Sequence, residues 1–566
     1  MRVNLKKFLT LTFATGILFS ATLSANAIPA NTGKIIRVGL SDTGFKNYYF
    51  NTTNVSATDN FRLQDKSTNS VIAKFEAEEN IQVLIKNNRF TIMRGNIIIA
   101  NGINGPVEVV SDNGYVKIYN LKRAGKTAFY RGTLEITKAP NKDNQFNVIN
   151  ILDLESYLRG VVPNEMPVRF GLEALKAQAI LARNYAIKPR EQNPHNYDVC
   201  DSVACQVYFG ANTEKELSDI AIKETADTVA MHEGELVLGL YSSTAGGYTE
   251  NYENAFSTNN SNGEKLFPGA PLPYLKGVPD NKKTPILDNE DAAKKFYTST
   301  PEGFDNASPY FRWTKEWEQT ELENILKKTL RAQSSAGFVN PKLINEEDFG
   351  TLKEIKVSKR GVSGKAMCVE IVTDKRTYYL QKELPIRRTF QKSNISLPSA
   401  NVIFEKTTEK DKTGKEITKI YAYGGGFGHG VGMSQYGAGE MAKQGYTYDE
   451  IIQHYFKNTA ITTYPIVLSC ESGKDTAIQT FHTEKKRATL VIENKFQFTK
   501  MTVIINGQEF LMELVPKMFK PDRFDISEYL QKGENTITYI LPYSELHKKP
   551  VRLYVELKEA PDDKRK

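Results

Sequence analysis

The sequence predicts an α+β protein with a β-rich N-terminal part, a mixed helical and β core, and an appended C-terminal β-sandwich. Three observations predict this class. Residues 34–137 alternate apolar and polar side chains between turn pairs. Residues 153–187 repeat apolar side chains at three- and four-residue spacing, and the chain after residue 470 changes to Lys- and Glu-rich strand patterns. With 566 residues, the chain is long enough for two or three domains, each with its own core.

The first residues, 1–27, predict a signal peptide. Arg2, Lys6 and Lys7 precede an apolar stretch over residues 8–21, and Ala-Asn-Ala at 25–27 forms a small-x-small cleavage site. The alternative is an uncleaved N-terminal anchor. The apolar run disfavours it because threonines and a glycine interrupt the run, which falls short of the roughly 20 residues that span a bilayer. We therefore expect an exported protein that is periplasmic, cell-wall associated or extracellular.

The charge and cysteine content exclude some classes of protein. The net charge is +8 at pH 7 and falls to about +5 without the three leader cations, a weak preference for anionic surfaces such as the cell wall. The basic clusters at 485–487 and 564–566 have no interleaved aromatic residues, so we expect no nucleic-acid partner. Only four cysteines occur, too few for a fold framed by disulfides.

The β-rich N-terminal part is expected to span residues 28–137. Its clearest signal is an apolar and polar alternation at 107–110, then Asn113-Gly114, then a second alternation at 115–119. Asn-Gly between two such runs is typical of a β-hairpin. We expect this region to be mainly strands joined by tight turns.

The core is expected to span residues 138–468. Asp153 is a candidate N-cap for a helix over 154–161 that stops before Pro163, and a second helix is expected from residue 172 to 186. Thr447 and Glu450 spell a capping box before a third helix. Between these helices the pattern predicts strands at 230–256, 352–357 and 366–380, and helix with loop at 285–350.

The last part, residues 469–566, is expected to form a separate β-sandwich with strands at 488–493, 500–505, 536–541 and 551–557. The segment 524–536 is similar to the closing strands of jelly-roll modules. The residues leave open whether this part binds sugar or only acts as a spacer for the rest of the chain.

Glu165 is the candidate catalytic residue. It lies in the segment VVPNEMP at 161–167, among valines, a methionine and two prolines. Loss of hydration favours the neutral carboxyl, so its pKa should rise towards the working pH, as a proton donor to a leaving oxygen requires. A glutamate that caps the next helix or faces solvent is the alternative.

A glycine-rich run at 424–439, GGGFGHGVGMSQYGAG, is the second candidate. Half of its residues are glycine, so its backbone can approach a ligand closely. It matches neither the dinucleotide nor the phosphate-loop spacing. His429, Ser434 and Gln435 are the polar side chains that this run could direct at a substrate.

The third candidate is a ligand set for a metal. His195, Cys200 and Cys205 have spacings that suit three ligands of one zinc ion. In an exported protein the two cysteines can instead form a disulfide, and the residues do not decide between these alternatives. Neither a Gly-x-Ser-x-Gly elbow nor a His-Glu-x-x-His motif occurs, which disfavours serine hydrolases and zincins.

Taken in order, these segments resemble the family of sporulation stage II protein D and the LytB amidase enhancers. The matching stretches are LESYLRGVVPNEMP (154–167), EALKAQAILARNYAI (173–187), DVCDSVACQVYFG (198–210), YSSTAGGYTE (241–250), PYLKGVPD (273–280) and GHGVGMSQYGAGEMAKQG (428–445). Several long motifs in the same order are far more specific than one glycine pattern. Weaker similarity extends over roughly residues 35–465, which excludes the predicted signal peptide and sandwich.

The resemblance implies a lytic transglycosylase that acts on peptidoglycan glycan strands stripped of their peptides, with Glu165 as the catalytic residue. It also implies a zinc ion on His195, Cys200 and Cys205, which would order the loop, although the ligand spacing varies within the family. A cell-wall amidase is an implied partner. Motif positions expected to line the cleft as substrate-binding residues are Gln178, Arg183, Tyr185, Gln206, Tyr208, Ser243, His429, Ser434 and Gln435.

One carboxyl group is sufficient for a lytic transglycosylase, whereas hydrolysis needs a second acid to activate water or attack carbon. Asp198, Asp201 and Glu250 are the candidates for that second acid. Two further hypotheses belong to other classes: a non-catalytic enhancer that binds glycan and activates an amidase, and a glycan-binding scaffold.

Overall fold

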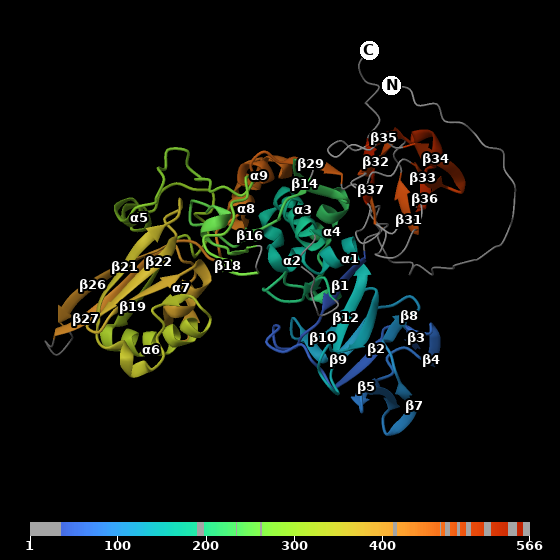
Figure 1. Ribbon diagram of the computed structural model, residues 1–566, viewed down its shortest axis with the longest axis horizontal. Coiled ribbons are helices and arrows are strands. Elements are labelled where there is room, and N and C mark those ends of the chain that lie inside the picture. The colour runs from blue at the N-terminus through green and yellow to red at the C-terminus, as the bar shows by residue number, and fades with distance from the viewer. Residues whose placement is uncertain are drawn as a thin grey trace, which may run out of the picture. The chain divides into compact units, whose positions relative to one another are not determined.

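The computed structural model describes residues 35–188, 197–233, 235–260, 263–410, 416–463, 466–469, 476–483, 487–493, 500–513, 522–540 and 552–558 (Figure 1). The chain divides into two compact units. Unit 1 comprises the described residues of Met1–Glu165, Pro189–Val229 and Ile461–Lys566, and unit 2 those of Met166–Lys188 and Ala230–Ala460. The predicted signal peptide lies outside the described residues. Among the described helices, none has the length and apolar character needed to cross a membrane.

The N-terminal part of unit 1 consists of two sheets. One has seven strands in the order β13-β1-β12-β11-β8-β3-β4, and the other has six in the order β10-β9-β2-β5-β6-β7. Phe90 of the second sheet packs against Phe146 of the first, with ring centroids 5.9 Å apart. The strands are β1 Ile35–Gly39, β2 Thr52–Ala57, β3 Phe61–Asp65, β4 Ser70–Phe75, β5 Ile81–Lys86, β6 Arg89–Arg94, β7 Ile97–Ile103, β8 Val107–Ser111, β9 Val116–Arg123, β10 Lys126–Tyr130, β11 Thr133–Lys138, β12 Phe146–Asp153 and β13 Val199–Cys200.

The hairpin predicted around Asn113-Gly114 has the right strands but the wrong pairing. β8 pairs with β3 and β11, whereas β9 pairs with β2 and β10, so the turn connects two different sheets. A two-residue hairpin of the Asn-Gly type needs positive φ at both residues. Neither Asn113 nor Gly114 is among the described residues with positive φ. The strands therefore diverge after the turn.

Unit 1 also contains the helices α1 Leu154–Arg159, α2 Val162–Glu165 and α4 Glu216–Glu224. The Asp153 side chain accepts the backbone N–H of Ser156 at 2.9 Å, which confirms the predicted N-cap of α1. Helix α1 ends at Arg159 with Gly160 as its C-cap, and Pro163 lies inside the following helical turn, α2. The connection expected around residue 165 is thus a single helical turn.

Helix α3, Leu172–Ile187, lies in unit 2 and confirms the second predicted helix. It packs against α8 Gln435–Lys443 and α9 Tyr448–Tyr455, and the capping box formed by Thr447 and Glu450 begins α9 as predicted. Twelve of the sixteen α3 residues are buried. Helix α3 is therefore an internal helix of this unit.

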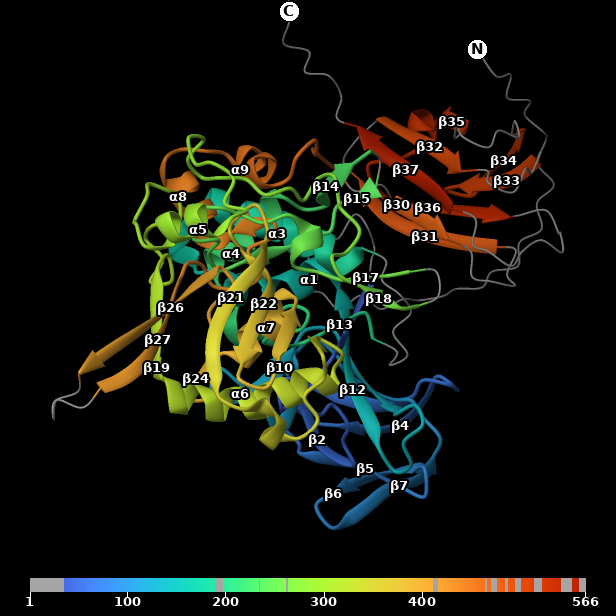
Figure 2. The same ribbon diagram turned by 60° about the vertical axis from the view of Figure 1, so that its left-hand side comes forward.

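The rest of unit 2 is a set of small sheets with helices beside them (Figures 1 and 2). Helix α6 packs on β19 and β27, and α7 on β22 and β23. The main elements are β14 Thr228–His232, β15 Glu235–Leu236, β16 Tyr241–Ser242, η3 Tyr252–Asn254, β17 Thr258–Asn259, β18 Lys265–Leu266, α5 Glu290–Tyr297, β19 Trp313–Glu318, α6 Gln319–Ser335, β20 Val339–Asn340, β21 Leu352–Arg360, β22 Ala366–Thr373, β23 Thr377–Gln381, α7 Glu383–Thr389, β24 Gln391–Lys392, β25 Ile395–Ser396, β26 Val402–Lys410, β27 Glu416–Gly424 and β28 Met433–Ser434.

Residues 466–558 contain two four-stranded sheets, ordered β30-β37-β32-β35 and β31-β36-β33-β34. Side chains from both sheets, such as Leu490 and Val503, belong to one hydrophobic core. Four of these strands match the expected ones. The bounds are β30 Ile466–Ser469, β31 Thr476–Thr483, β32 Arg487–Glu493, β33 Lys500–Ile505, β34 Gln508–Glu513, β35 Asp522–Asp525, β36 Gly533–Ile540 and β37 Arg552–Lys558.

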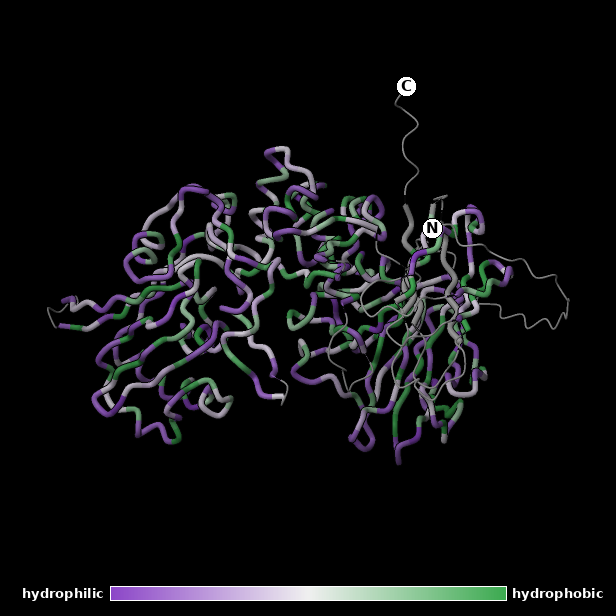
Figure 3. The backbone as a smooth tube through the Cα atoms, turned by 45° about the horizontal axis from the view of Figure 1, so that its top comes forward, coloured by the Kyte–Doolittle hydropathy of each residue, from purple (hydrophilic) through white to green (hydrophobic). Residues whose placement is uncertain are grey.

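The mixed α+β class is confirmed, and the described strands carry both hydrophobic and hydrophilic residues (Figure 3). Two expectations within unit 2 were wrong in detail. The region 230–256 contains only short strands and a 3-10 turn, and the region 285–350 includes the strand β19. Both differences arise where pairing with distant segments, rather than local pattern, decides the structure, since β19 pairs with β27.

Candidate active site

Glu165 is the last residue of α2, a single helical turn that needs support from its surroundings. The side chain of Asn164 supplies that support. Its amide nitrogen donates to the carbonyl of Gly160 and to the hydroxyl of Thr213, both at 2.7 Å. These two hydrogen bonds attach the turn to the end of α1 and to the 3-10 helix Gly210–Thr213. They thereby fix the backbone position from which the Glu165 side chain extends.

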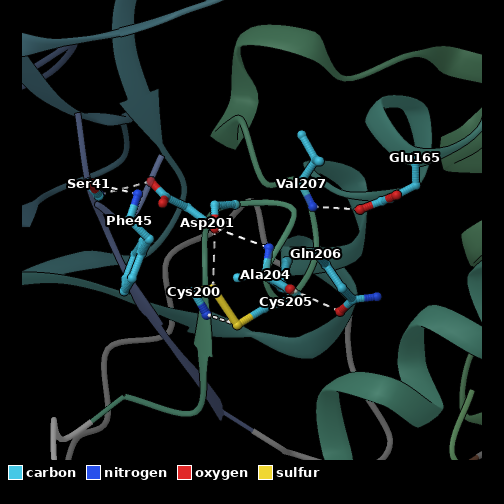
Figure 4. The surroundings of a disulfide bond; sticks show 11 residues. Ser41, Phe45, Glu165, Cys200, Asp201, Ala204, Cys205, Gln206 and Val207 are labelled. Carbon is cyan, nitrogen blue, oxygen red and sulfur yellow. Dashed lines mark hydrogen bonds between the residues drawn. A yellow bond between two sulfur atoms is a disulfide. The ribbon is translucent and has the colours of Figure 1, made fainter. Parts of the chain in front are cut away.

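The carboxyl of Glu165 is partly buried and receives one described hydrogen bond. The backbone N–H of Val207 donates to its Oε1 at 2.6 Å (Figure 4). Burial removes water from the carboxylate and raises its pKa to about 7, and the Val207 N–H lowers the pKa by a smaller amount. Glu165 therefore has a large protonated fraction at neutral pH, as a general acid requires.

The segment that carries Val207 is anchored by its two neighbours, Gln206 and Tyr208. The hydroxyl of Tyr157 donates to Oε1 of Gln206 at 3.0 Å, and the hydroxyl of Tyr208 donates to Oδ1 of Asn150 at 2.6 Å. The side chains of Gln206 and Tyr208 are essentially inaccessible to solvent. Both residues thus lie beside Glu165 in the chain's tertiary structure, although their side chains are directed into the core.

Cys200 and Cys205 form a disulfide in the same segment (Figure 4). The neighbouring Asp201 is buried, forms an ion pair with Arg123 and accepts the backbone N–H of Ser41 at 3.1 Å. Burial raises the pKa of Asp201 to about 6, against the opposing effect of Arg123. These contacts attach the disulfide loop to β9 and to the segment that follows β1.

The disulfide bears on the zinc prediction. Zinc binds cysteine as the thiolate, and the two sulfurs here are bonded to each other, so the cysteines in this state do not fit a zinc site. His195 lies outside the described residues. Among the described residues, no group of three or more His, Cys, Asp or Glu side chains is arranged to hold a metal. The zinc site stays a prediction.

The other predicted site residues lie in unit 2. Nε2 of Gln435 donates to Oε1 of Gln178 at 3.2 Å, which joins α8 to α3. Both glutamines are buried, and Nε2 of Gln178 has no hydrogen-bond partner in the described part of the chain. Arg183 is fully buried on α3, whereas Tyr185 is partly buried near the end of that helix.

Ser434 and His429 take structural hydrogen bonds. The Ser434 hydroxyl caps α8 by accepting the N–H of Gly437, and it donates to the buried carboxylate of Asp305 at 3.1 Å. His429 accepts the N–H of Val431 on Nδ1 at 3.1 Å, and burial lowers its pKa to about 3. His429 is therefore neutral at physiological pH.

Ser243, the remaining predicted residue, is partly exposed, and its backbone carbonyl accepts the N–H of Tyr436 at 3.0 Å. The predicted set thus falls into two groups. Glu165, the two cysteines, Gln206 and Tyr208 lie together in unit 1, and the other described members lie in unit 2.

The candidate second acids differ in the number of hydrogen bonds and ion pairs that their carboxylates form. Glu250 in unit 2 is fully buried and accepts hydrogen bonds from Asn251, Asn254, Val362 and two groups of Ser363. Asp201 is paired with Arg123, and Asp198 accepts the backbone N–H of Arg37 at 2.9 Å. The Glu250 carboxylate therefore has a structural role, because it joins residues 251–254 to residues 362–363.

The residues missed from sequence are those that act on Glu165 through the backbone or through the core. They include Val207, Tyr157 and Asn150, and Arg123 is a further missed residue because it pairs with Asp201. A backbone N–H leaves no side-chain signal in the sequence, although the position of Val207 between two motif residues was a usable hint. The partners Asn150 and Arg123 lie on strands far away in the chain, where no local pattern singles them out.

The Glu165 carboxyl thus lies on a helical turn held by the Asn164 side chain, has a raised pKa and accepts one backbone N–H, an arrangement suited to general acid/base chemistry. Residues 142–232, which contain Glu165, match the family described as Stage II sporulation protein. Residues 261–432 match a second family, described as a domain of unknown function.

Curated relatives agree with the first of these matches. The amidase enhancer of Bacillus subtilis is 28% identical over 54% of this chain, and the chain spans only 40% of that relative's length. The stage II sporulation protein D of the same species is 29% identical over 55% of the chain and 75% of that protein. An uncharacterized protein of Brachyspira hyodysenteriae is 29% identical over 56% of the chain and 68% of its own length. These matches show that the chain is similar to the stage II sporulation proteins and to an amidase enhancer.

Proposed function

We propose that the protein is a peptidoglycan lytic transglycosylase that cleaves the bond between N-acetylmuramic acid and N-acetylglucosamine in peptide-free glycan strands. The observation that carries this proposal is the partly buried carboxyl of Glu165, whose pKa is raised to about 7 by loss of hydration. A module that only binds glycan has no need of an acid tuned to neutral pH.

Glu165 performs both proton transfers of the reaction. As an acid it donates its proton to the glycosidic oxygen, and the bond from that oxygen to C1 of the muramic acid breaks with an oxocarbenium-like transition state. As a carboxylate it then takes the proton of the C6 hydroxyl while O6 bonds to C1. The product ends in 1,6-anhydro-N-acetylmuramic acid, no water is consumed, and Glu165 returns to its protonated form.

The engagement of two of the three candidate second acids, Asp201 and Glu250, supports a lyase over a hydrolase. A hydrolase needs a second acid that is free to activate water or to attack carbon. Asp201 is held by Arg123 and a backbone N–H, and Glu250 accepts five hydrogen bonds. A lyase needs neither of them, because the sugar supplies its own nucleophile.

The substrate implies the location. Glycan strands lie outside the cytoplasmic membrane, and the signal-peptide pattern of residues 1–27 supports export to that compartment. The positive net charge favours the anionic wall.

Product analysis tests the proposal. Residues 28–566 and their Glu165→Gln variant are incubated with purified peptide-free glycan strands, and the products are analysed by mass spectrometry. We expect anhydro-ended fragments, lighter by one water than hydrolysis products, from the unsubstituted protein alone. The matched control is Glu216→Gln, which neutralises an exposed glutamate of α4 in the same unit and should leave cleavage unchanged.

A second candidate function is a non-catalytic enhancer that binds glycan and activates a cell-wall amidase. It is favoured by one observation, the similarity to a Bacillus subtilis protein named amidase enhancer. The same experiment separates the two. Water-added ends would indicate a hydrolase, and the absence of any cleavage, together with stimulation of an added amidase, would replace the lyase by the enhancer.

A further inference from the structure

The backbone N–H that contacts Glu165 belongs to a residue whose two neighbours are both anchored in the core. Gln206 and Tyr208 precede and follow Val207, and their side chains are 0% and 1% exposed. Each is fixed by a tyrosine hydroxyl, since Tyr157 donates to Gln206 and Tyr208 donates to Asn150. Val207 thus lies between two residues whose side chains are fixed in the core, and its backbone N–H points at the Glu165 carboxyl (Figure 4).

The anchor at Tyr208 is built in detail. The amide nitrogen of Asn150 donates to the carbonyls of Arg131 and Thr133, at 2.9 and 3.0 Å, so its Oδ1 is held in place to accept the Tyr208 hydroxyl. The Tyr208 ring packs against the rings of Tyr130 and Tyr157, with centroids 5.9 and 5.1 Å away. A ring packed and hydrogen-bonded in this way cannot move without disturbing several neighbours.

Gly160 gives Tyr208 the space that it occupies. A Cβ atom at position 160 would lie 2.5 Å from Cε2 of Tyr208. The carbonyl of Gly160 also accepts the N–H of Phe209 at 3.1 Å and the side-chain amide of Asn164. The same glycine therefore contacts both the turn that carries Glu165 and the segment that carries Val207. These contacts hold the turn and the segment close together.

We propose that Gln206 and Tyr208 are positioning residues that hold the Val207 N–H against the carboxyl of Glu165 and thereby set the proton affinity of the catalytic acid. This assignment rests on the proposed function for its catalytic meaning. It differs from the role of substrate contact that their motif positions suggest, because buried side chains already engaged in the core are suited to support the site.

The assignment has a measurable consequence for Glu165. A hydrogen bond from a backbone N–H stabilises the carboxylate and lowers its pKa. When an anchor is removed, Val207 gains freedom, the hydrogen bond loosens, and the charged form of Glu165 loses stabilisation. We expect the pKa of Glu165 to rise by roughly half to one unit above its value in the unsubstituted protein.

The test is a titration of the Glu165 carboxyl by ¹³C NMR in protein with labelled glutamate, with the resonance assigned by its absence in Glu165→Gln. Tyr208→Phe and Tyr157→Phe each remove one anchoring hydroxyl and keep the ring. Tyr378→Phe is the matched control, because it removes a buried tyrosine's hydrogen bond to the Asp348 carbonyl in unit 2. Where Tyr208→Phe does not fold, Tyr157→Phe decides.

We expect the midpoint of the Glu165 titration to rise in the two anchor variants and to stay unchanged in the control. Equal midpoints in all folded variants would overturn the assignment, and so would an equal rise in Tyr378→Phe. The titration needs no substrate. If the unsubstituted protein cleaves no glycan, the proposed function fails while the titration still decides the positioning role. If it cleaves but the midpoints coincide, only the positioning role fails.

Discussion

At the scale of single residues, loss of hydration raises the pKa of a carboxyl group. The hydrogen-bond and ion-pair partners of each carboxyl then determine how far its charged form is stabilised. Glu165 is partly buried and Asp201 is buried, and loss of hydration raises both pKa values. Asp201 faces the guanidinium of Arg123, whereas Glu165 faces only a backbone N–H among the described residues. The pKa of about 7 at Glu165, against about 6 at Asp201, is consistent with this difference.

The raised pKa of Glu165 predicts a cost in stability at high pH. The native carboxyl titrates near pH 7 and an ordinary one near 4.5, so the folded protein binds an extra proton between these values. Stability therefore falls as the pH rises from 4.5 through 7. Glu165→Gln, which carries no charge, should stabilise unit 1 by about 1–3 kcal/mol at pH 8 and by little at pH 4.

Thermal unfolding at the two pH values measures this effect, with Glu216→Gln as the exposed control. Equal melting temperatures for Glu165→Gln and the unsubstituted protein at pH 8 would mean that the charge on Glu165 does not lower the stability of the folded protein at that pH. The acid/base role would then lose its physical basis.

At the scale of elements, the site depends on the close approach of α1 and the segment that carries Val207. Gly160→Ala places a methyl group 2.5 Å from the Tyr208 ring and 2.8 Å from the carbonyl oxygen of Gly210. The backbone at Gly160 has φ −86°, which alanine adopts without strain, so any effect comes from crowding. We expect a loss of about 1–3 kcal/mol in the free energy of unfolding.

Urea unfolding measures the loss caused by Gly160→Ala, and the glycan assay measures its effect on the site. Crowding should also slow cleavage, because the displaced segment carries the N–H that contacts Glu165. A variant with unchanged stability and unchanged cleavage would show that the two elements are not in close contact.

The loop closed by Cys200 and Cys205 makes a separate prediction. If the disulfide forms, the unfolded but unreduced protein has at most two reactive thiols, and reduction adds two more. A zinc site predicts instead four reactive thiols without reductant and one zinc ion per chain. Thiol counting with a colorimetric reagent and metal analysis of the same sample decide between them.

Local pattern identified much of this arrangement. Asp153 as an N-cap, the helix from residue 172, the capping box at Thr447 and the desolvated setting of Glu165 all follow from short-range spacing and side-chain chemistry. Local pattern cannot reveal which strand pairs with which, as the Asn113-Gly114 turn demonstrates. It also cannot reveal that Val207 offers its backbone to Glu165, since that contact spans 42 residues.

At the scale of the whole molecule, the predicted site residues divide between two units, and the C-terminal strands have a core of their own. All members of that core lie between Ala488 and Val555. We expect a chain that ends at residue 468 to cleave soluble peptide-free strands at the same rate as residues 28–566. The glycan assay measures this, and circular dichroism verifies folding. Loss of cleavage in a folded truncated chain would assign the C-terminal strands a part in substrate binding.

The pH dependence of glycan cleavage tests the central claim most directly. If Glu165 donates a proton from a carboxyl with a pKa of about 7, the single-turnover rate should be constant at low pH and fall about tenfold per unit above pH 7. Glu165→Gln should show no cleavage at any pH. A rate that increases through pH 7, one that falls with a midpoint near 4.5, or cleavage that persists in Glu165→Gln would contradict the assignment of Glu165 as the proton donor.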